Sequence, residues 1–343
     1  RRELTELGPL LLRNGSLVET GWARRPLKEL SPDSFGAVVF GIAALSRLKY
    51  RKLDEYMVFG EEEITFVALY ESPLRAFTIV ARYDRAEKVI EHETHQRLGG
   101  LGKEMQLPND PHHCPAGHSG SVRNGFTLSV RTEQAGADCL VLVEARLSSG
   151  RELSLPLQAK LGAEAVVEVA RLSADGRHWL HSFKKLFRAP AGFASVHFSR
   201  GLVPYKATAL LGAAAGRVSG GDFALNFGVL PAHNSTAVSE DSFTFNIIVH
   251  KLAPLEVRFD RLNLLNGFSV QSVGEHEEGK NRSAAAFTFR AEAHQRLGSN
   301  YLLAKNRWEV VFGTVSGWVS DETGTVLRFE ELPALVRIFD FKG

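Results

Sequence analysis

The sequence contains few cysteines: Cys114 and Cys139 are the only two in 343 residues. One pair is too few to staple a chain of this length, and the two side chains could equally be separate thiols in a reducing compartment. The fold must therefore be held by a hydrophobic core. We expect an intracellular, soluble protein of the cytoplasm or an organellar matrix.

An excess of charge of one sign is also missing. The 41 lysines and arginines nearly balance the 39 aspartates and glutamates, for a formal net charge of +2. The basic clusters are only pairs, such as Arg24-Arg25 and Lys184-Lys185. Phosphate binding needs a concentrated positive face, so we expect no nucleic-acid partner.

Long apolar runs are absent as well. The segment LGPLLL at 7–12 is far shorter than the roughly 20 residues that cross a bilayer, so we do not expect an integral membrane protein. With 44% apolar and 23% charged residues, the composition is that of a globular protein with a substantial core. A chain of this length is enough for about two domains.

Apolar residues instead alternate with mostly polar ones along much of the chain after about residue 50. The period of two is clear at 77–83, 126–130 and 153–157. Such alternation is typical of half-buried antiparallel strands with one face in a core. We therefore expect a mainly β protein of two antiparallel barrel-like or sandwich-like halves. Short helices are expected only at about 86–97 and 182–187.

Turn residues separate these segments, as at Asp175-Gly176 and Asn266-Gly267. Short strands at regular spacing favour barrels or sandwiches over a parallel sheet. Residues near 200–220 lie between the two main groups of strands. We predict an N-terminal half of residues 1–205 and a C-terminal half of residues 206–343.

The pentapeptide HQRLG occurs twice, at 95–99 and at 294–298. An ancient duplication would explain the match, but the flanking residues do not continue it. The alternative, which we favour, is two similar chain ends that are each closed by a glycine at positive φ.

The stretch 100–125 is rich in glycine, proline, asparagine and histidine, and it predicts a long surface loop. This loop has zinc-binding side chains but lacks the paired C-x-x-C spacing of structural zinc sites. These side chains are His112, His113, Cys114 and His118. We expect no metal there. The glycines of 212–221 lack the spacing of a phosphate-binding loop, so we expect no cofactor.

The segment 225–252, LNFGVLPAHNSTAVSEDSFTFNIIVHKL, places amides, hydroxyls and acids between two apolar runs. If residues 243–249 form one strand with its aromatic residues inward, Asn246 and His250 share the opposite face. Glu240 and Asp241 then lie at the mouth of a barrel, where partial burial raises the pKa of a carboxyl. Glu240 or Asp241 could act as a general acid beside His250. The alternative is that these residues cap turns and stay hydrated.

At these residues the sequence resembles the uncharacterised family called domain of unknown function 2804. The matching segments occur in order along nearly the whole chain. They are NGSLVETGWARRPL at 14–27, LKYRKLDEY at 48–56, HSFKKLFRAPAG at 181–192, SRGLVPYKATALLGAAAG at 199–216, FALNFGV at 223–229, SEDSFTFNIIVHKL at 239–252 and FGTVSGWVSDETG at 312–324.

The resemblance implies a fold similar to two-barrel, lipocalin-like proteins such as hydroxyneurosporene synthase and tocopherol cyclase relatives, whose ligands are apolar. The residues that match polar positions of the family pattern are Lys52, Lys184 or Lys185, Arg200, Gly201, Asn226, Glu240 and Lys251. Leu53 stands where the family tends to have tryptophan, and Asp241 replaces a typical amide. An acid usually found before the Arg-Gly pair is absent, since SVHFSRG offers His197 instead.

Together these features predict a protein that binds an apolar or amphipathic small molecule in a barrel mouth or in the seam between the halves. We expect its ligand-binding residues to be Lys184, Arg200, Asn226, Asn246 and Lys251. If there is catalysis, we expect cofactor-free isomerisation, cyclisation or hydration, with Glu240 as the proton donor and His250 or Asp241 tuning it. The alternative function is a non-catalytic subunit of a larger protein assembly.

Overall fold

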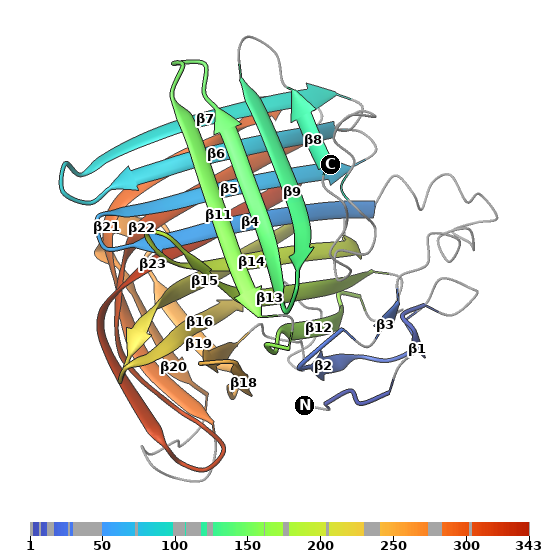
Figure 1. Ribbon diagram of the computed structural model, residues 1–343, viewed down its shortest axis with the longest axis vertical. Helices are drawn as coiled ribbons and strands as arrows, with labels where there is room; N and C mark the ends of the chain where they lie inside the picture. The colour runs from blue at the N-terminus through green and yellow to red at the C-terminus, as the bar shows by residue number, and fades with distance from the viewer. Residues whose placement is uncertain are drawn as a thin grey trace.

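The chain folds into two large antiparallel sheets that curl into half-barrels, which confirms the predicted fold class (Figure 1). The computed structural model describes residues 3–6, 8–11, 17–26, 28–29, 50–72, 75–98, 107, 118–121, 126–160, 162–173, 178–203, 206–229, 241–273, 283–301 and 304–342. Within these ranges, no helix is long and apolar enough to cross a membrane.

The first sheet has 12 strands. They are β2 (Gly21–Ala23), β4 (Tyr50–Gly60), β5 (Glu63–Ser72), β6 (Arg75–Asp84), β7 (Val89–Leu98), β8 (His118–Ser121), β9 (Thr127–Ala135), β10 (Asp138–Arg146), β11 (Glu152–Lys160), β12 (Val166–Arg171), β13 (Trp179–Ala189) and β14 (Gly192–Leu202). A separate parallel pair joins β1 (Gly8–Pro9) to β3 (Lys28–Glu29).

The second sheet has nine strands. They are β15 (Lys206–Val218), β16 (Gly221–Val229), β17 (Ser242–Phe245), β18 (Ile248–Lys251), β19 (Leu255–Phe259), β20 (Phe268–Ser272), β21 (Ala284–Tyr301), β22 (Ala304–Ser320) and β23 (Val326–Lys342). The sheets divide between β14 and β15. Whether the two halves behave as separate domains stays a prediction.

The two expected helices are strands, so that part of the prediction was wrong. Residues 182–187 lie inside β13, and residues 89–97 lie in β7. Ala86 and Glu87 form a turn in which both backbone N–H groups donate to Oδ1 of Asp84, each at 3.0 Å. The segment 86–97 therefore consists of this turn and most of β7. Within the described chain the helical element is one 3-10 turn, η2 (Leu264–Asn266).

Both sheets follow the same path. The first runs β7-β6-β5-β4-β14-β13-β11-β10-β9-β8, and the second runs β18-β17-β16-β15-β23-β22-β21-β20-β19. In the first sheet, β4 to β7 form a meander, and β4 also pairs with β14, the last strand of that sheet in chain order. In the second sheet, β15 to β18 form a meander, and β15 also pairs with β23, again the last in chain order. Residues 95–98 of the first HQRLG copy fall on β7 and the second copy falls on β21, and these two strands are not equivalent in this path. The pentapeptide therefore does not mark a duplication, and Gly298 lies inside β21, paired with Arg307, rather than closing a chain end.

The apolar core has three main layers. One fills the first half-barrel and includes Val67, Val143 and Phe187, and a second fills the other half-barrel with Phe223, Phe287 and others. The third lies between the sheets, where side chains of β4, β5 and β6 contact those of β15, β22 and β23. We call this layer the seam. In Figure 1 the blue strands β4 to β7 cross in front of the red strands that form its other side.

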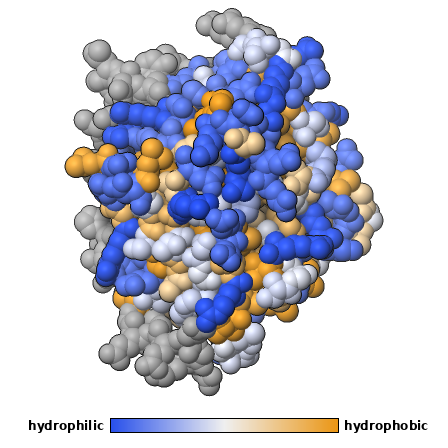
Figure 2. Space-filling view, turned by 90° about the vertical axis from the view of Figure 1, so that its left-hand side faces the viewer, coloured by the Kyte–Doolittle hydropathy of each residue, from blue (hydrophilic) through white to orange (hydrophobic). Residues whose placement is uncertain are grey.

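On the face of the molecule seen in Figure 2, apolar residues are scattered among hydrophilic ones. Of the largest buried side chains, Trp308 lies in the seam, whereas Trp179 lies in a smaller apolar cluster with residues such as Leu10 and Val167. Strands β4, β5 and β6 are covered on both sides, which accounts for their long buried runs. Charged residues in these strands are consequently removed from water, and they mark the candidate site.

Candidate functional site

Strand β4 carries charged side chains on both of its buried faces. Tyr56 and Val58 belong to the core of the first half-barrel, whereas Leu53 and Met57 belong to the seam. Because side chains alternate along a strand, Lys52 and Asp54 point into the half-barrel and Glu55 points into the seam. One strand thus contributes to two buried polar groups.

The group inside the first half-barrel consists of Lys52, Asp54, Glu71 and Arg200, and we call it the barrel cluster. Nη1 of Arg200 donates to Oδ1 of Asp54 at 2.6 Å, and both side chains are almost fully buried, at 0% and 1% exposed. The same Nη1 also donates to the backbone oxygens of Leu53 and Ser199. Lys52 and Glu71 form a second ion pair, with Nζ and Oε2 3.5 Å apart.

Burial changes the acid-base properties of the barrel cluster. Burial lowers the pKa of Lys52 most strongly, the positive charge of Arg200 lowers it further, and the nearby Glu71 and Asp54 only partly offset these effects. Burial raises the pKa of Tyr56 well above its usual range, and the negative charge of Asp54 adds to that shift. Lys52 is therefore easier to deprotonate than an ordinary lysine.

Leu107 closes the barrel cluster from the side of the β7–β8 connection. Its side chain is buried in the core of the first half-barrel. Its backbone N–H donates to Oε2 of Glu71 at 3.2 Å, and its carbonyl oxygen accepts from Nζ of Lys52 at 2.6 Å. The expectation of a surface loop over 100–125 is thus wrong at Leu107, while most of that stretch lies outside the described residues.

The second polar group lies in the seam and joins the two sheets. It consists of Glu55 in β4, His197 in β14 and Arg337 in β23, and we call it the seam triad. Oε2 of Glu55 lies 2.6 Å from Nδ1 of His197 and 3.2 Å from Nη1 of Arg337. Nη1 of Arg337 also contacts Sδ of Met57. All three side chains of the triad are at most 1% exposed.

Three of the predicted ligand-binding residues face the seam or its edge. Lys184 is buried and lies opposite His197 in the β13–β14 register. Asn226 is buried on the seam side of β16, since its neighbours Leu225 and Phe227 face the other core. Nζ of Lys251 contacts Oε1 of Glu168, which joins β18 to β12. Arg200, the fourth, belongs to the barrel cluster.

Asn246 and His250 do not lie on one strand, because the chain turns at Asn246, a turn that the sequence pattern did not reveal. Residues 242–251 form a hairpin of β17 and β18 rather than one strand. Asn246 turns the chain with φ of 56°, and its Oδ1 accepts from the backbone N–H of Asp222. The ring of His250 stacks on Phe243 at 4.7 Å, and its Nδ1 lies 2.9 Å from Oε2 of Glu322. The predicted strand over 243–249 was therefore wrong, and His250 lies on the side of β18 away from the seam.

Asp241 is fully buried and binds backbone groups. Its Oδ1 accepts from the N–H of Gly228 at 3.1 Å, and its Oδ2 accepts from the N–H of Leu255 at 3.0 Å. The carboxylate thereby ties the end of β16 to the start of β19. Glu240 lies outside the described residues, so its predicted role as proton donor stays a prediction.

The expected absence of a metal concerned residues 112–114, which also lie outside the described ranges, and His118 in β8. Within the described residues, no group of three or more histidines, cysteines, aspartates and glutamates is arranged to hold a metal ion.

Asp54, Glu55 and Arg337 were missed as candidates by sequence reasoning. The sequence did indicate that these charges could be buried, because they lie inside otherwise apolar segments, LDEYMVF at 53–59 and LVRIF at 335–339. His197 was noted only as the residue found where an acid was expected. The sequence could not show that these charges from distant strands meet.

Comparison with known proteins supports the family resemblance. The model of the family described as domain of unknown function (DUF2804) matches residues 1–336. No curated protein matches the chain. Kievitone hydratase from Nectria haematococca shares 9% identity over 85% of this chain and 88% of that chain, with a TM-score of 0.40. A protein of Nitrosomonas europaea assigned provisionally as AttH shares 12% identity over 98% of this chain and 99% of that chain, with a TM-score of 0.39. Both TM-scores are below 0.5, so we base no argument about function on these two structures.

Proposed function

The chain belongs to the DUF2804 family, and we propose that it binds an amphipathic small molecule at the end of the first half-barrel that holds the barrel cluster. The polar end of the ligand contacts Lys52 and Glu71, and its apolar part enters the core of the half-barrel. The observation that carries this proposal is the position of Leu107.

The backbone and side chain of Leu107 make the contacts that we expect of such a ligand. A hydrogen-bond donor meets Glu71, an acceptor meets Lys52, and an apolar group points inward. A molecule with a carboxylic acid or amide group and an apolar body fits the same contacts. Binding then requires that the ligand replace Leu107 at the cluster.

The charges of the barrel cluster also favour a functional role. Buried ion pairs are costly to desolvate, and apolar residues of similar size often stabilise a protein at least as well. Shifted pKa values inside a concave site are typical of functional residues. Lys52 and Glu71 retain some exposure, at 15% and 17%, whereas Asp54 and Arg200 lie deeper. A ligand therefore meets the Lys52–Glu71 pair first.

The same residues can support proton transfer, and we propose cofactor-free isomerisation, cyclisation or hydration as the reaction class if the ligand is turned over. The lowered pKa of Lys52 brings its amine closer to the range in which it can exchange a proton at neutral pH. Asp54 and Arg200 would orient the polar end of the ligand. The alternative centre at Glu240, with His250 and Asp241, is tested separately by Glu240→Gln in a turnover assay on an identified ligand.

Binding of 11-(dansylamino)undecanamide, a fluorescent fatty amide, tests the proposal, because its amide group offers a donor to Glu71 and an acceptor to Lys52. We expect Lys52→Met to weaken binding by about tenfold, the effect of one lost polar contact of about 1.4 kcal/mol. Leu107→Ala should tighten it, because the competing side chain is shortened. Lys160→Met removes an exposed lysine of β11 and serves as the matched control. Equal affinity of Lys52→Met and the unchanged protein would rule out this site.

Native mass spectrometry of protein purified from its source cells separates the two function classes. A bound amphipathic small molecule supports the proposal. A stable complex with another protein and no small molecule favours the accessory-subunit alternative.

A further inference from the structure

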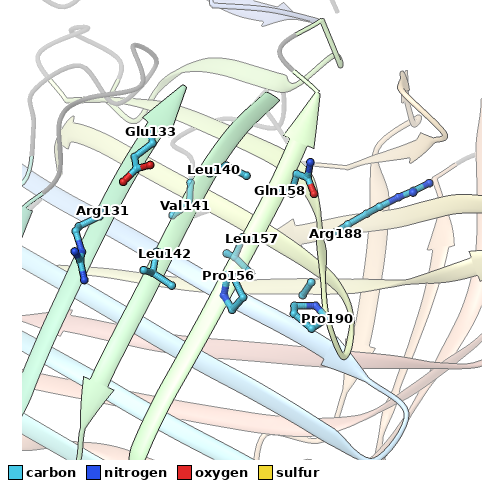
Figure 3. Close-up of a pocket in the computed structure, with 11 residues that line it drawn as sticks. Arg131, Glu133, Leu140, Val141, Leu142, Pro156, Leu157, Gln158, Arg188 and Pro190 are labelled. Carbon is cyan, nitrogen blue, oxygen red and sulfur yellow. The ribbon is translucent and has the colours of Figure 1, made fainter. Parts of the chain in front are cut away.

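A cleft of about 460 Å³ lies on the outside of the first half-barrel, away from the barrel cluster. Its floor is formed by β10 and β11, and the turn between β13 and β14 stands on one side (Figure 3). The residues that line it include Arg131, Leu140, Leu142, Pro156, Gln158, Arg188 and Pro190. Its volume falls within the range of small-molecule sites.

The floor of the cleft is more apolar than its position explains. Val141 and Val143 of β10 point into the core of the half-barrel, so the alternating Leu140 and Leu142 point outward. Both outward leucines are half-buried. A strand with one hydrated face normally places polar residues there, and apolar residues on both faces indicate that both faces are covered.

The cleft exists because the sheet splits beside it. Strands β11 and β13 pair at a single position, Gln158 with Arg188, and then β13 pairs with β12 instead. The free edge of β11 contains Pro156, which has no N–H to donate to an added strand. An extended peptide that adds a strand is therefore disfavoured as the occupant.

Each of the two arginines that line the cleft contacts an acidic residue. Arg131 contacts Glu144, and Nη2 of Arg188 lies 2.7 Å from Oδ2 of Asp222. The side-chain amide of Gln158 donates to Asp138 at 2.8 Å. In Figure 3 the guanidinium of Arg188 points away from the floor. The cleft thus offers an apolar floor, and both of its arginines are already paired with acids.

We propose that this cleft is a second binding site, which takes an uncharged and mainly apolar small molecule. The ligand lies against Leu140, Leu142 and Pro156 and is bounded by Pro190. This site is independent of the proposed function, because the barrel cluster faces the inside of the same half-barrel.

Three probes with the same apolar body test the charge preference: 2-naphthol, 2-naphthoate and 2-naphthylmethylammonium. Isothermal titration of the full chain should show the tightest binding for uncharged 2-naphthol at a pH where it is neutral. Leu142→Glu should weaken that binding by at least about tenfold, because a carboxylate on the floor would be desolvated by the ligand. Leu262→Glu, at a side chain that is 99% exposed elsewhere, is the matched control and should bind as the unchanged protein does.

Circular dichroism and thermal unfolding check that both variants fold, and Leu140→Gln provides a milder second change. The variant Lys52→Met separates the two sites. If Lys52→Met removes naphthol binding and Leu142→Glu does not, the cleft proposal is overturned and the barrel site gains support. Tighter binding of either charged probe also overturns it. A change from dimer to monomer caused by Leu142→Glu, without any effect on naphthol binding, would identify the cleft as a contact between two copies and would likewise overturn the proposal.

Discussion

Arg337 and Glu55 join the two half-barrels through one contact, with Nη1 of Arg337 3.2 Å from Oε2 of Glu55. Neither side chain reaches water, and the same carboxylate oxygen also contacts His197. The net stabilisation by such a buried pair is small, because desolvation opposes the attraction. The loss of one partner is costly, because the other charge remains buried without it.

We predict that Arg337→Met lowers the free energy of unfolding by about 3 kcal/mol or more, since Glu55 loses its cation. The double variant Glu55→Gln with Arg337→Met should recover most of that loss, because no carboxylate remains buried beside an apolar side chain. Urea denaturation of the four proteins of this double-mutant cycle measures the coupling. Additive losses would contradict the ion-pair interpretation.

The lowered pKa of Lys52 predicts a specific pH dependence of stability. Between this lowered value and the ordinary value of 10.5, the unfolded chain binds the proton more tightly than the folded protein does. The contribution of Lys52 to the free energy of unfolding therefore rises as pH increases through this window. It falls again as pH decreases toward the pKa of Lys52 in the folded protein.

The difference in unfolding free energy between the unchanged protein and Lys52→Met isolates this effect, because Tyr56 titrates in both proteins. We expect the difference to shift in favour of the unchanged protein from neutral pH to about pH 10. A difference that stays constant over this range would show that the pKa of Lys52 is not lowered by folding.

Gly192, the first residue of β14, should tolerate no side chain. Its φ is 148°, and a Cβ would lie 2.4 Å from the backbone oxygen of Phe59 on β4. Gly192→Ala should destabilise the protein by about 2 kcal/mol or more. Gly136→Ala is the matched control, because Gly136 also has a positive φ but no atom within 4 Å of its Cβ position. That change should cost about 1 kcal/mol, and similar losses in thermal unfolding would contradict the steric argument.

Arg24 and Glu164 bind the two backbone polar groups of Val249. Nη1 of Arg24 donates to the carbonyl oxygen of Val249, and Oε2 of Glu164 accepts from its N–H at 2.7 Å. We predict that Arg24→Gln speeds amide hydrogen exchange in β18, where Arg25→Gln, a change at an exposed neighbour, leaves it unchanged. Equal exchange in both variants would show that this contact does not restrain the hairpin.

Much of the fold could be predicted from alternation, but alternation does not locate every turn. The residues Phe243, Phe245, Ile247 and Val249 keep a period of two across the β17–β18 turn, so the pattern reads as one strand. The turn residue is Asn246, and no glycine follows it to signal a hairpin. The helix expected at about 86–97 was likewise a turn followed by β7.

The candidate site was predicted only in part for a different reason. Arg200, Lys184, Asn226 and Lys251 were found through the family resemblance, and the structure places them in the barrel cluster, the seam or its edge. The partners of these residues depend on how the sheets pack. Glu55 and Arg337 are 282 positions apart in sequence, and a local sequence pattern cannot predict a contact between residues that far apart.

The double coverage of β4 has a consequence for synthesis. Strands β4, β5 and β6 leave the ribosome well before β22 and β23 are synthesised, so their seam-facing side chains are exposed to water at that stage. Glu55 is then present without Arg337, its cationic partner. Such long-range pairings form slowly, and an uncovered apolar sheet is open to aggregation meanwhile. We therefore expect this apolar face to stay exposed until residues 206–343, which form the second sheet, have been synthesised.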